Sequence, residues 1–176
     1  MPVAGPGIIS EKLVCAMNQK LVGDAFGLSP MQQGMLFHHL KEPYSGIDVE
    51  QLVVCLPEIV CVPRLEEAWR WLVRRHDILR TQFVWDAVER PQQVILPKVS
   101  VPFVFEDSQQ LSESEQREYF KNFLEKDRLC GFELNCAPML RIALFQWGES
   151  SFSLVWTFHH ALLDGRCFPI LLSEVF

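Results

Sequence analysis

The sequence has few basic residues, and they do not gather into a cluster. Its 176 residues include 16 Lys and Arg against 22 Asp and Glu, so the net charge is −6. No basic cluster stands out beyond the pair Arg74–Arg75. Because nucleic acids and anionic membranes attract strongly basic surfaces, this deficit argues against both as main partners.

Long apolar runs are also lacking, and so is the basic segment that opens a secretory signal. A membrane-spanning helix needs about 20 apolar residues, and no run approaches that length. We therefore expect a cytosolic protein with no membrane partner. No two cysteines have the C-x-x-C spacing of redox or metal sites, so we expect reduced, buried thiols. The cysteines are Cys15, Cys55, Cys61, Cys130, Cys136 and Cys167.

Internal repeats and low-complexity tracts are absent as well. What is present is apolar: hydrophobic residues make up 49% of the chain, enough for one domain with a sizeable core. We expect residues 1–23 to form a tail or linker and residues 24–176 to form the folded part.

The apolar periodicity predicts both helices and strands. Helices are expected to begin at Ser29–Pro30, Pro63 and Ser112, where capping residues or a proline at the first helical position precede apolar stripes. The stripe expected on the first helix is Met31, Met35, Leu36 and Leu40. Strands are predicted at residues 52–56, 80–84, 92–96, 101–105, 139–147 and 152–158. The chain is therefore expected to have an α/β fold.

The stretch from His159 to Gly165 is the most informative part of the chain. It reads HHALLDG and follows the predicted strand 152–158. Strand ends beside glycine-containing turns are where rigid scaffolds present catalytic side chains, and imidazole is the usual general base near neutral pH. A second doublet, His38–His39, lacks the Asp-Gly pair, and we expect it to be partly exposed on the protein surface.

A metal site at this motif is disfavoured. Adjacent residues of a strand point to opposite faces, so His159 and His160 cannot easily share one ion with Asp164. We expect no metal here.

The last segment, residues 166–176, has the pattern of an apolar helix without an end signal. Such a helix needs a surface to pack on. We therefore expect the chain to be a piece of a longer protein.

Three stretches together resemble the N-terminal half of a condensation domain from a non-ribosomal peptide synthetase. They are Leu28–His38 (LSPMQQGMLFH), Arg75–Phe83 (RHDILRTQF) and Phe158–Gly165 (FHHALLDG), in the order that the family has them. Residues 131–141 also lie where family members carry a similar stretch. After the Asp-Gly pair, where the family usually has an aromatic residue and then a serine, this chain has Arg166 and Cys167.

The resemblance implies a chloramphenicol-acetyltransferase-like fold, with a mixed, mostly antiparallel sheet flanked by helices. Such domains have two lobes with the active site in a tunnel between them, and residues 24–176 would be the first lobe, without the C-terminal lobe. The implied reaction joins an acyl or peptidyl thioester to an aminoacyl amine, both tethered to carriers. The implied partners are donor and acceptor peptidyl carrier domains and an adjacent adenylation domain. No cofactor would bind directly, because the phosphopantetheine arms belong to the carriers.

The resemblance also implies roles for the motif residues. His160 is the expected catalytic imidazole, which accepts a proton from the amine or holds the amine in line with the thioester. His159 is expected to fix the loop. Asp164 is expected to form an ion pair with an arginine rather than to orient the imidazole as in a triad. Gly165 would allow close approach of the substrate and offer its N–H to an oxyanion.

Two arginines are expected to stabilise the structure, and a third is a candidate to contact the substrate. Arg75 and Arg80, in the second motif, are expected to be ion-pair partners rather than substrate binders. Arg166 and Cys167 are candidates to line the substrate tunnel.

Three alternatives remain open at this point. In the first, the chain belongs to a relative of the same fold that forms esters or epimerises a tethered residue. The absent second lobe would discriminate between these reactions and amide formation. In the second, the chain is a lobe without catalytic activity that only docks partners. In either case, residues 1–176 alone are expected to be inactive. A soluble acetyltransferase that uses a diffusible cofactor fits the first two motifs less well.

Overall fold

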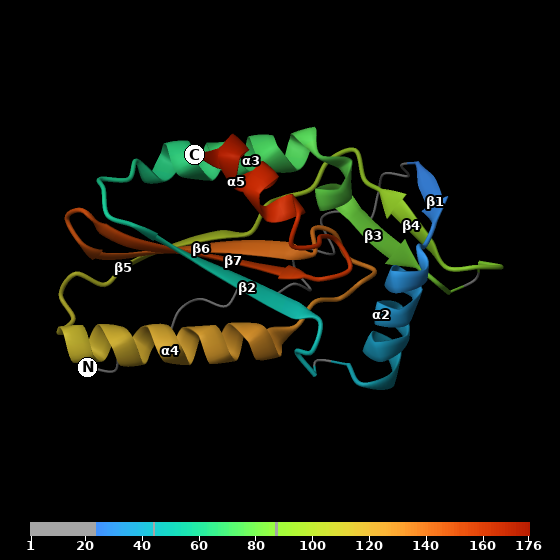
Figure 1. Cartoon of the computed structure of the whole chain (residues 1–176), viewed down its shortest axis with the longest axis horizontal. Helices are drawn as coiled ribbons and strands as arrows, with labels where there is room; N and C mark the ends of the chain where they lie inside the picture. The colour runs from blue at the N-terminus through green and yellow to red at the C-terminus, as the bar shows by residue number, and fades with distance from the viewer. Residues whose placement is uncertain (1–23, 44, 87) are drawn as a thin grey trace.

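A four-stranded sheet forms the centre of the molecule in the computed structural model, which describes residues 24–43, 45–86 and 88–176 (Figure 1). The strand order is β2-β7-β6-β5. Strand β5 is parallel to β6, and the other pairs are antiparallel, as a mixed, mostly antiparallel sheet requires. The bounds are β2 Val49–Leu56, β5 Phe103–Asp107, β6 Leu140–Gly148 and β7 Ser151–His159. The predicted tail, residues 1–23, lies outside the described residues.

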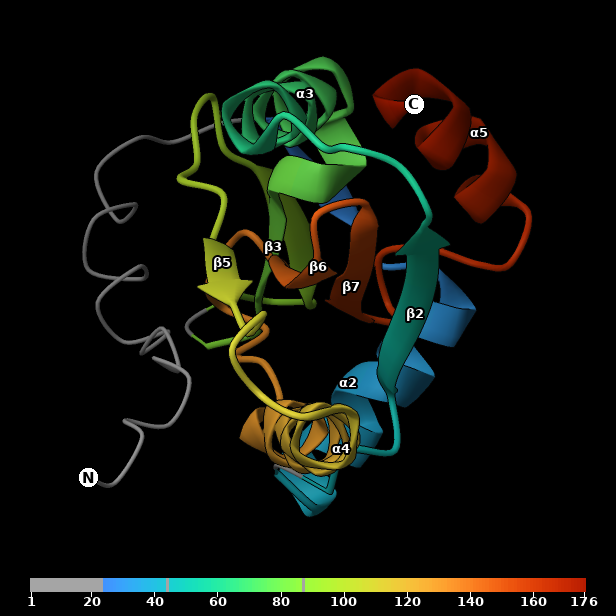
Figure 2. The same cartoon turned by 90° about the vertical axis from the view of Figure 1, so that its left-hand side faces the viewer.

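Helices cover both faces of this sheet (Figure 2). Helices α3 (Val62–Arg75) and α5 (Cys167–Val175) lie on one face, and α4 (Glu113–Cys130) lies on the other. The capping box of α4 between Ser112 and Glu115 is present as predicted. Because both faces are covered, every residue of β7 after the first is buried, which explains its nearly continuous apolar sequence.

A second, three-stranded sheet adjoins the first and has the antiparallel order β1-β4-β3. It contains the predicted hairpin, formed by β3 (Thr81–Val84) and β4 (Gln92–Ile95), together with the short strand β1 (Ala25–Gly27). A 3₁₀ turn at Asp77–Arg80 joins α3 to β3. Neither the short strand β1 nor the division of the strands into two sheets was predicted from the sequence.

Helix α2 (Pro30–Lys41) begins at the predicted Ser29 cap and lies beside the small sheet (Figure 1). Only part of its predicted stripe is buried: Met35 and Leu36 lie in the core, but Met31 is 64% exposed and Leu40 is 53% exposed. The predicted stripe of four residues was therefore wrong for Met31 and Leu40. Helix α2 lies at the end of the molecule and contacts the core through one narrow side only.

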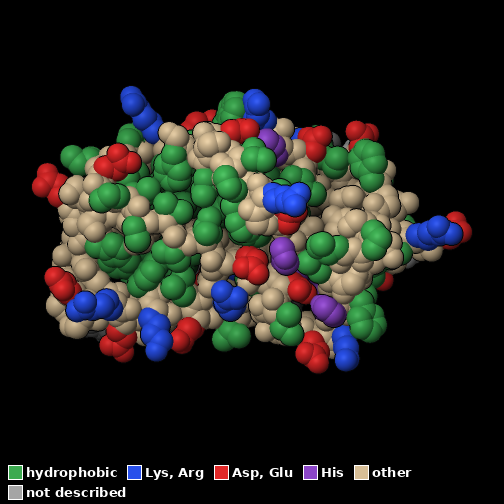
Figure 3. Space-filling view, viewed as in Figure 1, with side chains coloured by type: hydrophobic (Ala, Val, Ile, Leu, Met, Phe, Trp, Pro, Cys, Tyr) green, Lys and Arg blue, Asp and Glu red, His purple; other side chains and the backbone are tan. Residues whose placement is uncertain are grey.

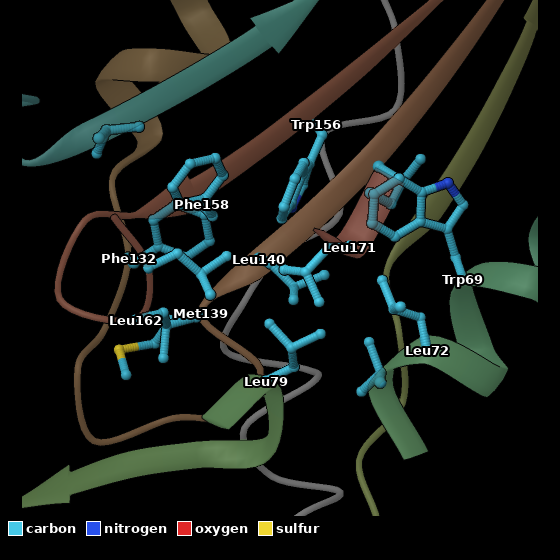
Figure 4. Packing of buried hydrophobic residues seen from close by; sticks show 14 of the residues in the cluster. Trp69, Leu72, Leu79, Phe132, Met139, Leu140, Trp156, Phe158, Leu162 and Leu171 are labelled. Carbon is cyan, nitrogen blue, oxygen red and sulfur yellow. The ribbon is translucent and has the colours of Figure 1, made fainter. Parts of the chain in front are cut away.

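The largest apolar cluster lies between the main sheet and α3 and α5 (Figure 4). The Trp69 ring of α3 contacts the Trp156 ring of β7, with centroids 5.2 Å apart. Leu171 of α5 and Leu162, which belongs to the histidine motif, join the same cluster. A smaller cluster around Phe145 packs under α4. The loop after β7 is therefore anchored in the core by its own apolar residues.

The expectation of reduced, buried thiols was wrong for several cysteines. Cys55 and Cys61 are exposed, because one lies on the edge strand β2 and the other caps α3. Cys136 is disulfide-bonded. Cys15 lies outside the described residues. No helix among the described residues has both the length and the apolar character that crossing a membrane requires.

Candidate active site

The histidine doublet lies where the central strand β7 ends. The last pair of the ladder is His159 with Val49 of β2, and the His159 N–H donates to the carbonyl of Met139 just before β6 at 3.0 Å. The next N–H, of His160, donates to the carbonyl of Asp48 at 2.8 Å. The two imidazoles are thus fixed by backbone bonds to segments on both sides of the strand.

The side chain of His160 has a defined tautomer. Its Nδ1 lies 2.8 Å from the carbonyl oxygen of Leu163. A carbonyl only accepts, so Nδ1 must carry a proton, and in the neutral imidazole Nε2 keeps its lone pair. Nε2 of His160 has no hydrogen-bond partner within residues 24–43, 45–86 and 88–176, and the residue is only half-buried. This arrangement leaves one accessible proton-accepting nitrogen.

The side chain of His159 has the opposite tautomer and is buried. The Ala161 N–H donates to its Nδ1 at 3.2 Å, so its proton lies on Nε2. Phe132 packs edge-on against the ring, with centroids 6.5 Å apart. Burial, with smaller contributions from the neighbouring His39 and His160, lowers the pKa of His159 to about 4. His159 is therefore neutral at physiological pH, and its acceptor nitrogen already holds the loop.

A small cavity of about 20 Å³ adjoins His159. It is mostly polar, and its size suits a single water molecule. His39 lines it too, and burial lowers the pKa of His39, which is half-buried as expected of this second doublet. Part of the second doublet thus lies beside the first, although sequence reasoning had kept them apart.

Asp164 is exposed and does not form the expected ion pair. Its Oδ1 accepts the backbone N–H of Arg166 at 2.9 Å and the thiol of Cys167 at 3.5 Å. The Arg166 N–H is the main reason that the pKa of Asp164 is lowered. Within the part of the chain that the structure describes, no arginine side chain pairs with this carboxylate. Its position at the start of α5 explains why it binds donors of that turn instead.

The three residues after Asp164 lie at the protein surface. A Cβ added to Gly165 would meet nothing within 4 Å, so no close contact in the described chain requires glycine there. Arg166 is exposed, and Cys167 is half-buried with a free thiol. Of the two candidate tunnel residues, Arg166 therefore ends the loop that carries His160, and Cys167 begins α5 and packs partly against the core.

Arg80 and Arg75 both make ion pairs. Arg80 is 11% exposed, pairs with Asp77, and donates to the carbonyls of Leu96 and, at 3.2 Å, of Val73. Arg75 is more exposed, and its Nε lies 3.2 Å from Glu174 of α5. These contacts fit the structural role that the sequence suggested for the two arginines.

A buried polar network that the sequence reasoning did not identify lies under β7. Asp127 of α4 is 7% exposed and accepts from Arg141 Nε at 2.5 Å, Thr157 Oγ1 at 2.6 Å and Gln51 Nε2 at 2.8 Å. The Arg141 guanidinium also lies 4.3 Å from the Phe132 ring centroid. Since Phe132 packs against His159, the network supports the wall behind the first histidine. An acidic residue on a helix gives no sign in the sequence that it is buried.

The model of the condensation-domain family matches residues 22–176. The chain belongs to the condensation-domain family. Among its curated relatives, one of the linear gramicidin synthase proteins of Brevibacillus parabrevis is 42% identical over 154 residues, which cover 88% of this chain and 3% of that protein. One of the plipastatin synthase proteins of Bacillus subtilis (strain 168) is also 42% identical, over 87% of this chain and 4% of the relative. The condensation-domain match thus spans a small part of these long proteins.

Solved condensation domains have the same fold. The starter condensation domain of rhizomide synthetase RzmA superimposes with a TM-score of 0.78 at 18% identity, covering 87% of this chain and 38% of that one. The first condensation domain of the calcium-dependent antibiotic synthetase gives a TM-score of 0.79 at 16% identity, with 88% and 38% covered. These matches confirm the predicted chloramphenicol-acetyltransferase-like fold class.

Proposed function

We propose that this chain supplies the catalytic histidine for amide-bond formation between two carrier-tethered substrates. The amine of the aminoacyl acceptor attacks the thioester carbonyl of the donor, a C–N bond forms, and the C–S bond breaks. The amine loses a proton, and the departing sulfur gains one. His160 Nε2 accepts the first proton and is placed to return it to the sulfur. The observation that carries this proposal is the Nδ1–H bond to Leu163, which leaves Nε2 as the proton-accepting nitrogen of the neutral imidazole.

The other motif residues serve His160 in this proposal. His159 is neutral and its Nδ1 is occupied, so it fixes the loop and does not act as a second base. Asp164 shapes the turn into α5 through the Arg166 N–H. Gly165 leaves open space on the loop, which gives room for a tethered substrate.

Residues 24–176 act, in this proposal, as the first lobe of a two-lobe domain. Hydrophobic side chains gather on the side of the molecule where β2 and α3 lie (Figure 3). Val53 on β2 and Ile170 on α5 are among the exposed apolar residues. A C-terminal lobe would cover such a surface and would place Arg166 and Cys167 in the tunnel between the lobes.

The partners in this proposal are donor and acceptor carrier domains, whose phosphopantetheine arms bring the two substrates, and an adenylation domain. One solved relative, AB3403, is a four-domain non-ribosomal peptide synthetase, which supports such a setting. The phosphopantetheine arms would remain covalently attached to the carriers, so the chain needs no bound cofactor of its own.

The test is the substitution His160→Ala in the synthetase that carries this chain, assayed with two loaded carriers. Loss of a positioned proton-transfer group is expected to lower the rate by about 10²–10⁴. The matched control is His38→Ala, whose side chain is 59% exposed and belongs to the other doublet. A His160→Ala enzyme that forms the amide as fast as the control would contradict the proposal.

A further inference from the structure

Gln32 connects helix α2 to the histidine loop. Its Nε2 donates to the carbonyl of Ala161 at 3.3 Å and to Oε1 of Gln93 at 3.2 Å. Gln32 is only 9% exposed, so these bonds are shielded from water. Ala161 directly follows His160, and the bond reaches the loop from an element 129 residues away in sequence.

Ala161 is held on both sides of its backbone. Its N–H donates to His159, and its carbonyl accepts from Gln32. Two residues further on, the Leu163 carbonyl fixes the tautomer of His160. Because these bonds lie two residues apart on one short loop, a shift of the Ala161 carbonyl would also move the Leu163 carbonyl, on which the His160 tautomer depends.

Gln32 itself is fixed by the start of α2. Its Oε1 accepts the Ser29 N–H at 2.9 Å, and its own N–H donates to Ser29 Oγ at 3.2 Å, which completes a capping box. Its neighbour Gln93 is fixed in turn, since Gln93 Nε2 donates to the carbonyl of Gly27 at 3.3 Å. The donor that meets the histidine loop is therefore presented by a side chain with little freedom.

We propose that Gln32 is a positioning residue for His160, acting through the Ala161 carbonyl. This inference rests on the proposed role of His160. The two ends of the Gln32 amide then have different functions. Its oxygen caps α2, and its nitrogen holds the loop that carries the catalytic imidazole.

Two substitutions separate these functions. Gln32→Glu keeps an acceptor for the Ser29 N–H, and Glu is a preferred residue at this position of a capping box, but a carboxylate cannot donate to Ala161. Gln32→Met removes donor and acceptor without adding charge. Two controls match them. Ser29→Ala removes the cap and leaves the donor, and Gln33→Glu makes the same charge change at the next residue, whose side chain bonds to Leu28.

The first readout is condensation kinetics in the synthetase. Gln32→Glu and Gln32→Met should lower kcat about tenfold, with KM for the loaded carriers unchanged, because misplacing a catalytic group slows the reaction without altering how carriers dock. Ser29→Ala and Gln33→Glu should keep kcat within about twofold of the wild type. A kcat for Ser29→Ala as low as that for Gln32→Glu would assign the effect to capping and overturn the inference.

The second readout uses the 176-residue chain and does not depend on activity. Hydrogen exchange of the Ala161 and Leu162 amides should be faster in both Gln32 variants than in both controls. Unchanged exchange in the Gln32 variants would overturn the inference. If His160→Ala condensed normally, the proposed function would fail, whereas the exchange measurement would still decide whether Gln32 holds the loop.

Discussion

Substitution of Asp127 by asparagine should destabilise the protein strongly, because this carboxylate lies at the centre of the buried network under β7. One oxygen, Oδ1, accepts from Arg141 Nε, and the other, Oδ2, accepts from Thr157 and Gln51. Asparagine offers one oxygen and one NH₂ group. Whichever way the amide is turned, its NH₂ faces a donor, and the carboxylate charge opposite the guanidinium is lost.

The size of the effect follows from the burial of this pair. Asp127 and Arg141 have side chains that are 8% and 13% exposed. Removal of one partner of such a pair costs about 3–5 kcal/mol, because the remaining charge loses a carboxylate contact in a region shielded from water. For a chain of this size each kcal/mol shifts Tm by about 2–4 °C, so Asp127→Asn should lower Tm by roughly 10 °C.

The matched control is Glu113→Gln on the same helix. Glu113 and Arg117 are 3.6 Å apart, and their side chains are 87% and 76% exposed. Solvent screens such a pair, so the control should change the free energy of unfolding by at most about 0.5 kcal/mol. Thermal and urea unfolding of the two variants measure the difference. A Tm for Asp127→Asn within about 2 °C of the control would refute the assignment of the network as a buried ion pair.

Three further predictions concern the site and its surroundings. The pKa of His159 is lowered to about 4 in the folded protein, so the unfolded chain binds a proton at this residue first as pH falls. The free energy of unfolding should therefore be about 2 kcal/mol lower at pH 5 than at pH 7. Urea titrations of wild type and His159→Gln at both pH values measure this, and equal pH dependence in the two would contradict it. Asp164→Asn should leave Tm nearly unchanged, since the carboxylate is exposed and an amide oxygen still accepts the Arg166 N–H; a large drop in a thermal melt would show a partner that the described residues lack. Glu174→Gln should lower the free energy of unfolding by at most about 1 kcal/mol and loosen α5, because Glu174 pairs with His76 at 2.8 Å and Arg75 at 3.2 Å on a partly exposed surface. Faster hydrogen exchange of the α5 amides would show this loosening, and unaltered exchange would contradict it.

Local sequence signals predicted the elements that carry the site. The Ser29 and Ser112 caps located the starts of α2 and α4, and the apolar run before the doublet located β7. Those signals act within one turn or one strand, so a single sequence reveals them. The family resemblance added the fold class, which the superimposed condensation domains confirm.

Long-range contacts could not be read in the same way. Gln32 and Ala161 are 129 residues apart, and Gln51 and Asp127 are 76 apart. Their bonds exist only after the sheet has brought α2, α4 and β7 together. The ion pair expected for Asp164 would likewise have needed a partner distant in sequence. In the structure this carboxylate instead accepts the backbone N–H of Arg166, two residues away.

The tautomer of His160 tests the central claim most directly. At a pH at which the imidazole is neutral, ¹⁵N NMR of the 176-residue chain should show the His160 proton on Nδ1, bonded to the Leu163 carbonyl, and none on Nε2. Such a spectrum places the proton-accepting nitrogen where the proposed chemistry needs it. A spectrum in which Nε2 carries the proton would contradict the account, because His160 would then have no accessible lone pair for the attacking amine.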